Sequence, residues 1–196
     1  SSLNLQRPLK ATLDTVAERV VETTRAVACS VTIVNEGGGF DAAGSFGLPA
    51  GFLELAHLAL AGGAQSPNLR VLETGQRRVV HNVRAGTLGN PGDAALGDLI
   101  RQVEWDTMVI IPMAFGGEVV GTIEAFYRPE DEPDGREVEL IEAMTGQAAT
   151  SIENARLFAQ TERRVRQLEA LGGIASSFTF EQPVEAMLSN LAEQVV

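Results

Sequence analysis

The alternation of apolar and polar positions divides the chain into helices and short strands. Apolar residues at helical spacing predict a helix over residues 8–27. Two apolar runs on either side of a glycine pair, 108–115 and 118–127, predict a hairpin. The other predicted elements are strands over 29–35, 40–46 and 78–82, a turn over 36–39, helices over 51–61, 67–74 and 95–104, a loop rich in glycine and proline over 84–97, and one long helix from about 134 to 171 that ends at Gly172 and Gly173. The helix over 67–74 is expected to start with Ser66 as its N-cap and Pro67 in its first turn and to end at Gly75. This order predicts an α+β fold with an antiparallel sheet.

An internal repeat suggests how the chain is organised. Residues 1–21 and 176–196 align without gaps and are identical at nine of 21 positions, among them Pro8 and Pro183. Chance similarity between two amphipathic helices is the alternative, but a shared proline at a helix start favours a repeat. We therefore expect a domain over residues 1–160, a helical linker over 161–175, and in 176–196 the opening helix of a second, truncated domain.

Composition and charge narrow the class of protein. Acidic residues number 26 against 15 lysines and arginines, which gives a net charge of −11 and argues against a nucleic-acid partner. No apolar run approaches the roughly 18 residues of a membrane span, so no membrane contact is expected and a cytoplasmic location is predicted. The single cysteine, Cys29, excludes an internal disulfide and a site built from several thiolates.

Three segments carry a resemblance to a known family. They are LETGQRRVVHNVRA over 72–85, MVIIPMAFGGEVVGTIEAFYR over 108–128 and ELIEAMTGQAATSIENARLF over 139–158. On these segments the sequence resembles a GAF domain over about residues 5–160. The resemblance implies an antiparallel sheet of about six strands, with the terminal helices on one face and a ligand pocket on the other. It also implies dimerisation through those helices and a place in a signalling protein, such as a sensor histidine kinase with tandem GAF domains, a cyclase or a phosphatase.

The same resemblance leaves the ligand open, because this family binds cyclic nucleotides, tetrapyrroles, haem, small organic molecules or nothing. Ser30 follows Cys29, whereas bilin-binding members carry a histidine next to the cysteine. Members that reduce free methionine sulfoxide use several cysteines, and the signature of cyclic-nucleotide binders is absent. Residues 60–69 also depart from the family pattern in the part that lines the pocket. A small organic molecule of unknown identity is therefore the expected ligand.

The strands predict which residues face this pocket. In 118–127, Val120, Thr122, Glu124 and Phe126 share one face, and Val119, Gly121, Ile123, Ala125 and Tyr127 share the other. We expect the second set to meet the terminal helices, with Gly121 and Ala125 allowing close approach, and the first set to meet the ligand. The candidate pocket residues are Ser30, Thr32, Phe52, His57, Trp105, Met108, Thr122, Glu124 and Phe126. The alternative is that the polar members face solvent.

Haem is a second candidate ligand, with His57 or His81 as the axial ligand. Family members that bind haem place this ligand near the hairpin that begins at about Met108, and here residues 99–108 contain no histidine. No pair of histidines has the spacing of a metal site, so no metal is expected. The ordinary alternative for both histidines is a structural role.

The long helix predicts a dimer. Phe158 and Val165 lie seven residues apart, as do Thr161 and Leu168, with charged residues between them. This heptad spacing is typical of a parallel two-helix linker, so we expect a homodimer joined by these four residues. The alternative is a monomeric helix packed on its own sheet.

The function predicted from these patterns is regulatory rather than catalytic. The sequence contains no nucleophile elbow, phosphate-binding glycine loop or paired-carboxylate motif. We expect a sensory domain that couples occupation of its pocket by a small molecule to a helical dimer linker, with any kinase, cyclase or phosphatase output elsewhere in the native protein. A ligand-free module for dimerisation and relay is the competing hypothesis.

Overall fold

A computed structural model describes residues 7–35, 39–61 and 66–179. The chain divides into two compact units, Ser1–Ala155 and Arg156–Val196. The elements are α1 (Arg7–Thr23), β1 (Ala28–Val34), β2 (Phe40–Phe46), α2 (Phe52–Ala61), α3 (Pro67–Thr74), β3 (Arg78–Val80), α4 (Val83–Gly89), the 3-10 helix η1 (Pro91–Leu96), α5 (Gly97–Ile100), β4 (Thr107–Phe115), β5 (Glu118–Tyr127) and α6 (Gly135–Thr179).

The strands of the described residues form one antiparallel sheet in the order β2-β1-β5-β4-β3. This confirms the α+β fold with five strands, one fewer than the number the sequence suggested. Gly116 and Gly117 join β4 to β5 with φ angles of 60° and 90°, as a type I′ hairpin turn requires. Ser30 on β1 lies opposite Glu124 on β5, which brings the predicted polar residues together at the centre of the sheet.

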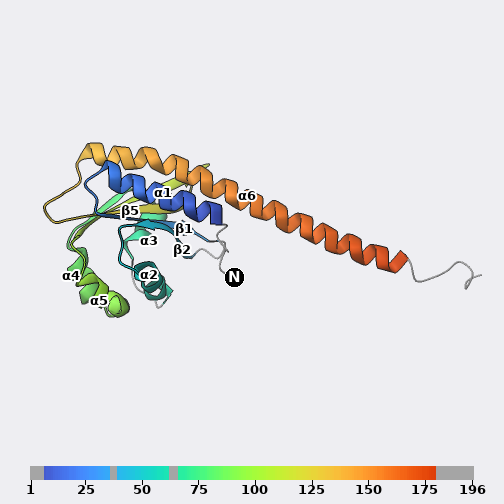
Figure 1. The fold of residues 1–196 in the computed structure, drawn as a ribbon, viewed down its shortest axis with the longest axis horizontal. Helices are drawn as coiled ribbons and strands as arrows, with labels where there is room; N and C mark the ends of the chain where they lie inside the picture. Colours follow the sequence, from blue (N-terminus) through green and yellow to red (C-terminus); the bar gives the residue numbers. More distant parts are fainter. Residues whose placement is uncertain (1–6, 36–38, 62–65, 180–196) are drawn as a thin grey trace, which may run out of the picture. The chain divides into compact units, whose positions relative to one another are not determined.

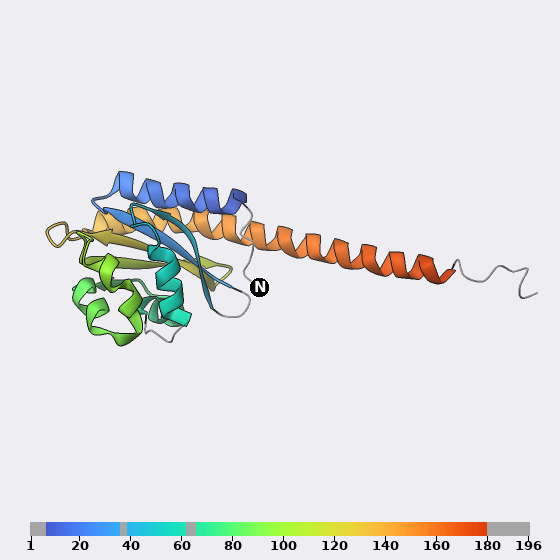
Figure 2. The same ribbon diagram turned by 60° about the horizontal axis from the view of Figure 1, so that its bottom comes forward.

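The two terminal helices of this unit lie side by side on one face of the sheet (Figures 1 and 2). Leu13 and Val20 of α1 and Ile141 and Ile152 of α6 are buried there against the sheet. Burial of an aliphatic side chain of this kind contributes roughly 1.5–3 kcal/mol, so this layer supplies much of the stability. The buried sheet residues that meet these helices are apolar apart from the hydroxyl group of Tyr127.

Two glycines show where backbones approach most closely. A Cβ atom on Gly44 of β2 would lie 2.6 Å from the backbone carbon of Leu13, so α1 packs directly on this glycine. Gly121 was predicted to allow a terminal helix to approach closely, and this prediction was wrong. A Cβ there would lie 2.2 Å from the Thr32 carbonyl oxygen and 2.7 Å from Met113 Cε, so the close contact is within the sheet rather than with a helix.

A bulge changes the alternation at the start of β5. Gly121 pairs with Met113 and Val119 pairs with Ala114, which leaves Val120 as the extra residue. Val120 therefore joins the core under α1 and α6, while Val119 lies 3.9 Å from the position of a Cβ on Gly75, at the end of α3. The sequence had placed these two valines on the opposite faces.

The opposite face of the sheet carries α2, α3, α4, η1 and α5 (Figure 1). Ser66 caps α3 through a hydrogen bond from the Asn68 N–H, Pro67 occupies its first turn, and Gly75 ends it in the left-handed conformation, all as predicted. The predicted loop over 84–97 is instead helical, as α4 and η1. The backbone N–H groups of Val83 and Arg84 donate to the backbone oxygen and the carboxylate of Asp106, which satisfies the first turn of α4.

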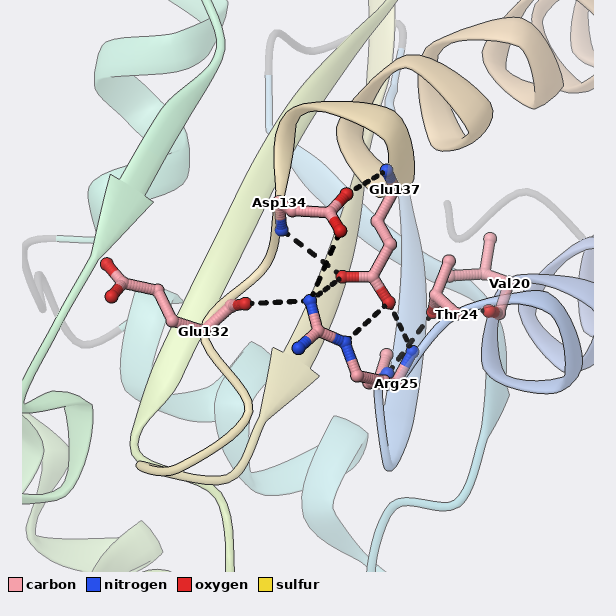
Figure 3. Close-up of polar contacts among 7 residues, drawn as sticks. Val20, Thr24, Arg25, Glu132, Asp134 and Glu137 are labelled. Carbon is pink, nitrogen blue, oxygen red and sulfur yellow. Dashed lines mark hydrogen bonds and ion pairs between the residues drawn. The ribbon is translucent and has the colours of Figure 1, made fainter.

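A polar cluster fastens the connection after α1 to the first turn of α6 (Figure 3). The Glu137 carboxylate accepts the Arg25 backbone N–H at 2.7 Å and the Arg25 Nη2 at 2.8 Å. Asp134 and Glu137 also form a capping box, because each side chain accepts the backbone N–H of the other. One glutamate thus caps α6 and holds the chain that leaves α1.

The helix α6 extends from Gly135 to Thr179 without the predicted break at Gly172 and Gly173. A glycine inside a helix costs only about 1 kcal/mol and ends it only where a capping conformation follows. The described part of the chain contains no helix long and apolar enough to span a membrane. Most of the predicted second-domain helix, residues 180–196, and most of the predicted turn over 36–39 lie outside the described residues.

Candidate ligand cavity

A cavity of about 330 Å³ lies between the sheet and the helical segments α2 to α5. This volume is at the lower end of the range for small-molecule sites. All five strands and the helical segments α2, α3, α4, η1 and α5 contribute to its lining. Eight of the nine predicted pocket residues line it: Ser30, Thr32, Phe52, His57, Trp105, Met108, Glu124 and Phe126. The ninth, Thr122, is fully buried beneath them.

A polar cluster centred on Glu124 forms one part of the wall. Glu124 is 2% exposed, and its Oε2 accepts Ser30 Oγ at 2.5 Å and Thr32 Oγ1 at 3.2 Å. Its Oε1 accepts Asn68 Nδ2 at 2.8 Å and the hydroxyl of Thr122. A carboxylate has about four acceptor positions, and four protein donors fill them here.

Burial and hydrogen bonding act in opposite directions on this carboxyl group. Burial raises the pKa of Glu124 to about 7, although hydrogen bonds from Ser30, Thr122, Thr32 and Asn68 favour the charged form. Among the described residues that line the cavity, none is a lysine or arginine. In the described part of the chain, the negative charge of Glu124 is therefore balanced by neutral donors and not by a lysine or arginine of the cavity lining.

Three aromatic side chains form the adjoining apolar wall. The ring centroids of Trp105 and Phe126 are 4.5 Å apart, and Phe52 meets both edge-on at 5.8 and 6.3 Å. All three are at least nine-tenths buried. Phe126 and Glu124 share a face of β5 two residues apart, about 7 Å along the strand, so the aromatic wall adjoins the carboxylate cluster.

The rim of the cavity is polar. His57 on α2 and His81 after β3 are exposed and lie along it. The Nδ1 atom of His81 is 3.3 Å from Thr107 Oγ1, and its Nε2 is 3.8 Å from a Glu132 oxygen. Asp93 of η1 adds a second carboxylate, which accepts Asn90 Nδ2 at 2.8 Å. Both predicted haem-ligand candidates thus reach the cavity rim, and haem binding itself stays a prediction.

Sequence reasoning missed Asn68, the residue that joins α3 to the carboxylate cluster. The Ser66-Pro67 start of α3 was recognised, and this start fixes Asn68 in the first turn of that helix. The signal that could have identified Asn68 is an amide side chain in the first turn of a helix that covers a polar position of the sheet. Asp93 and Asn90 were missed because they lie in the segment expected to be a loop.

The described residues contain no group of three or more histidine, cysteine, aspartate or glutamate side chains arranged for a metal ion. Cys29 lies on the helix-facing side of the sheet, in the core under α1 and α6, and is fully buried. Burial and the charge of Glu124 raise its pKa well above the ordinary value. A thiol in this environment is a poor nucleophile.

An antiparallel sheet with terminal helices on one face and a helix-covered cavity on the other is an arrangement found in sensory and regulatory domains. A family model for GAF domains matches residues 6–153, and the chain belongs to this family. GAF domains serve in signalling proteins, so the broad prediction of a sensory or regulatory domain is supported.

Solved structures share the fold at low sequence identity. The GAF domain/HD domain protein from Geobacter sulfurreducens is 17% identical with a TM-score of 0.58, over 78% of this chain and 96% of that one. A domain of a putative two-component sensor histidine kinase from Sinorhizobium meliloti 1021 is 15% identical with a TM-score of 0.56, over 79% and 96%.

One similar structure is an enzyme. The type II free methionine-R-sulfoxide reductase from Thermoplasma acidophilum is 8% identical with a TM-score of 0.55, over 78% of this chain and 96% of that one. The fold is therefore compatible with catalysis as well as regulation. No functionally curated protein matches the chain at a significant level.

Proposed function

We propose that residues 7–155 form a sensory domain that binds a small organic molecule in the cavity between the sheet and α2 to α5. The observation that carries this proposal is the cavity itself, about 330 Å³ with a buried polar cluster beside an aromatic wall. A few placed polar groups in a mostly apolar cavity are typical of a small-molecule site. The competing hypothesis, a ligand-free relay module, predicts that bulky side chains fill this volume.

The sheet offers a route from the cavity to the terminal helices. Glu124 and Phe126 face the cavity, and their neighbours Ile123 and Ala125 belong to the core under α1 and α6. A ligand that shifts β5 therefore changes the surface on which both helices pack. It biases the helices only to the extent that it binds their two arrangements with different affinity.

The output of the domain is a helical homodimer linker in the second half of α6. Phe158, Val165 and Leu168 are 56%, 48% and 68% exposed, and Thr161 donates its hydroxyl to its own helix. Apolar side chains this exposed at heptad spacing favour pairing with a second copy. The tandem arrangement suggested by residues 176–196 belongs to the same proposal.

We propose a regulatory rather than an enzymatic role. The buried Cys29 thiol lies on the sheet face opposite the cavity and is poorly suited to reduce a bound substrate. Glu124 is enclosed by four donors. The hydroxyl that lies within hydrogen-bond distance of His81, that of Thr107, is buried and does not line the cavity. These features support binding without turnover.

Intrinsic fluorescence provides a direct test. Trp105 is the single tryptophan of the chain, is 3% exposed and lines the cavity. A ligand that enters the cavity should change the emission of Trp105 and raise the melting temperature of the protein. A ligand at a free concentration 100 times its dissociation constant stabilises the fold by about 2.7 kcal/mol. Screening a metabolite panel by both measurements distinguishes a small-molecule sensor from a ligand-free relay module. An absorption spectrum after expression with haem supply tests haem binding.

A matched pair of variants tests whether a compound that stabilises the protein binds in the cavity. Ala56 of α2 lines the cavity, whereas Leu58 on the same helix is 61% exposed and does not. Ala56→Trp should abolish the stabilisation by a hit, and Leu58→Trp should leave it unchanged. No stabilisation by any compound, in a protein whose cavity is filled by its own side chains, would overturn the proposal.

A further inference from the structure

We infer that the ligand of this cavity is a small primary amine with an apolar or aromatic body, bound as an ammonium ion. This inference rests on the proposed function and specifies the ligand class at the same site. It is carried by the direction of the hydrogen bonds around Glu124, by the charges that line the cavity and by the position of the aromatic wall.

The hydrogen-bond donors around Glu124 point toward its carboxylate and away from the cavity. Ser30 and Thr32 each have one hydroxyl proton, and each donates it to Glu124 Oε2. Toward the cavity these two hydroxyl groups therefore present lone pairs and no proton. Asn68 donates one N–H to Glu124 and keeps its Oδ1 acceptor. A ligand group beside this cluster meets mostly acceptors and must itself be a hydrogen-bond donor.

The charged side chains of the described cavity lining favour a cationic ligand. Two carboxylates line the cavity, Glu124 on the sheet and Asp93 on η1, and no lysine or arginine lines it among the described residues. A buried carboxylate without a cation is unfavourable unless it is neutralised or receives a countercharge. An ammonium group supplies that charge, whereas a carboxylate or phosphate ligand would be repelled.

The aromatic wall favours an apolar or aromatic ligand body beside the ammonium group. Phe126 lies two residues from Glu124 on the same face of β5, and Trp105 and Phe52 pack against it. Two residues span about 7 Å along a strand, so the carboxylate cluster and the aromatic wall are neighbours, as the nitrogen and the apolar body of a small amine require. An aromatic wall also attracts a cation that approaches its faces. The cavity thus has an end for the ammonium group and an end for the apolar body.

Three probes of one shape test the inference on the wild-type chain. They are 2-phenylethylamine, 2-phenylethanol and 3-phenylpropanoate, which differ mainly in the charge of the polar end. By titration calorimetry and Trp105 emission, the amine should bind at least about tenfold tighter than the alcohol, as a charge-assisted hydrogen bond predicts, and the carboxylate should bind weakest. Binding of the alcohol or the carboxylate as tightly as the amine overturns the inference and leaves the proposed function intact.

Variants of the cavity residues show which side chains produce the preference for the amine over the alcohol. Glu124→Gln should remove the advantage of the amine over the alcohol, and Thr32→Val, which removes one acceptor at nearly constant shape, should reduce it. Glu118→Gln makes the same change at an exposed residue of the same strand and should have no effect. If Glu124→Gln fails to fold, Thr32→Val and the three probes on the wild-type chain still test whether the cavity prefers an amine. An amine preference unchanged in Thr32→Val, or no binding by any probe, also overturns the inference, whereas the metabolite panel decides separately on the proposed function.

Discussion

Glu137 accepts hydrogen bonds from both the backbone and the guanidinium group of Arg25, a residue 112 positions earlier in the chain (Figure 3). Burial alone would raise the pKa of Glu137, but the hydrogen bonds from Arg25 and Asp134 outweigh it, and the pKa is lowered. A lowered pKa in the folded state means that the charged form stabilises the fold. The contact therefore ties the exit of α1 to the start of α6 at every pH above the acid range.

Glu137→Gln should destabilise the fold, since it removes the charge from the Arg25 pair and weakens the capping box. We expect a loss of about 1–3 kcal/mol near neutral pH, measured by urea unfolding. The loss should shrink as the pH falls below about 4.5, because Glu137 also loses its charge there in the wild type. Glu139→Gln, two residues on and exposed, is the matched control. Equal stability of the two variants would contradict this account.

Gly44→Ala should disrupt the packing of α1 on the sheet. The new Cβ would lie 2.6 Å from the Leu13 backbone carbon and 2.8 Å from the Asp14 nitrogen, so the helix itself must move. Overpacking of this kind costs about 1–3 kcal/mol. Gly146→Ala in α6, where a Cβ meets nothing within 4 Å, should instead stabilise by up to about 1 kcal/mol. Thermal unfolding of both variants checks the contrast in sign.

Glu124 should make the fold less stable as the pH rises. Its pKa is about 7 in the folded state against 4.5 in the unfolded state, so the native state binds more protons between these values. Stability therefore falls from about pH 4.5 to pH 7 and stays low above it, with a total change on the order of 3 kcal/mol.

Comparison with Glu124→Gln isolates this contribution. Asp93, His57 and His81, which line the same cavity, and Cys29, which lies behind Glu124, are common to both proteins. Urea unfolding at a series of pH values should show the slope in the wild type and its loss in the variant. The same slope in both proteins would assign the pH dependence to other groups.

Leu168→Glu should weaken the proposed dimer. Leu168 is 68% exposed and lies seven residues from Thr161 in the heptad stretch. A buried charge at a seam position should raise the dissociation constant by about tenfold or more, measured by analytical ultracentrifugation. Gln167→Glu adds the same charge one position away and should have little effect. A wild-type chain that is monomeric at all concentrations would refute the dimer linker.

Local patterns predicted most of the fold because each element carries its own signals. The bounds of β2 and β5 follow from alternation and glycine turns, and α3 follows from Ser66, Pro67 and Gly75. The cavity residues on the sheet were predicted for the same reason, since period-two alternation assigns a face to each side chain.

The errors arose where a distant residue decides the local conformation. Residues 83–89 are helical although rich in glycine, because Asp106 satisfies the N–H groups of their first turn. Val120 leaves its expected face because β5 holds one residue more than its partner β4 at that point. Asn68 joins the cavity only through the tertiary placement of α3. None of these relationships appears within a local sequence window.

The strict alternation along residues 123–126 of β5 has an evolutionary consequence. Glu124 and Phe126 contact the cavity, whereas Ile123 and Ala125 contact the core beneath the helices. In the proposed sensory domain, substitutions at the first pair can alter the ligand preference while the second pair preserves the packing of the helices. Under that proposal, ligand selectivity and helix packing are encoded at interleaved positions, and each can diversify without the other.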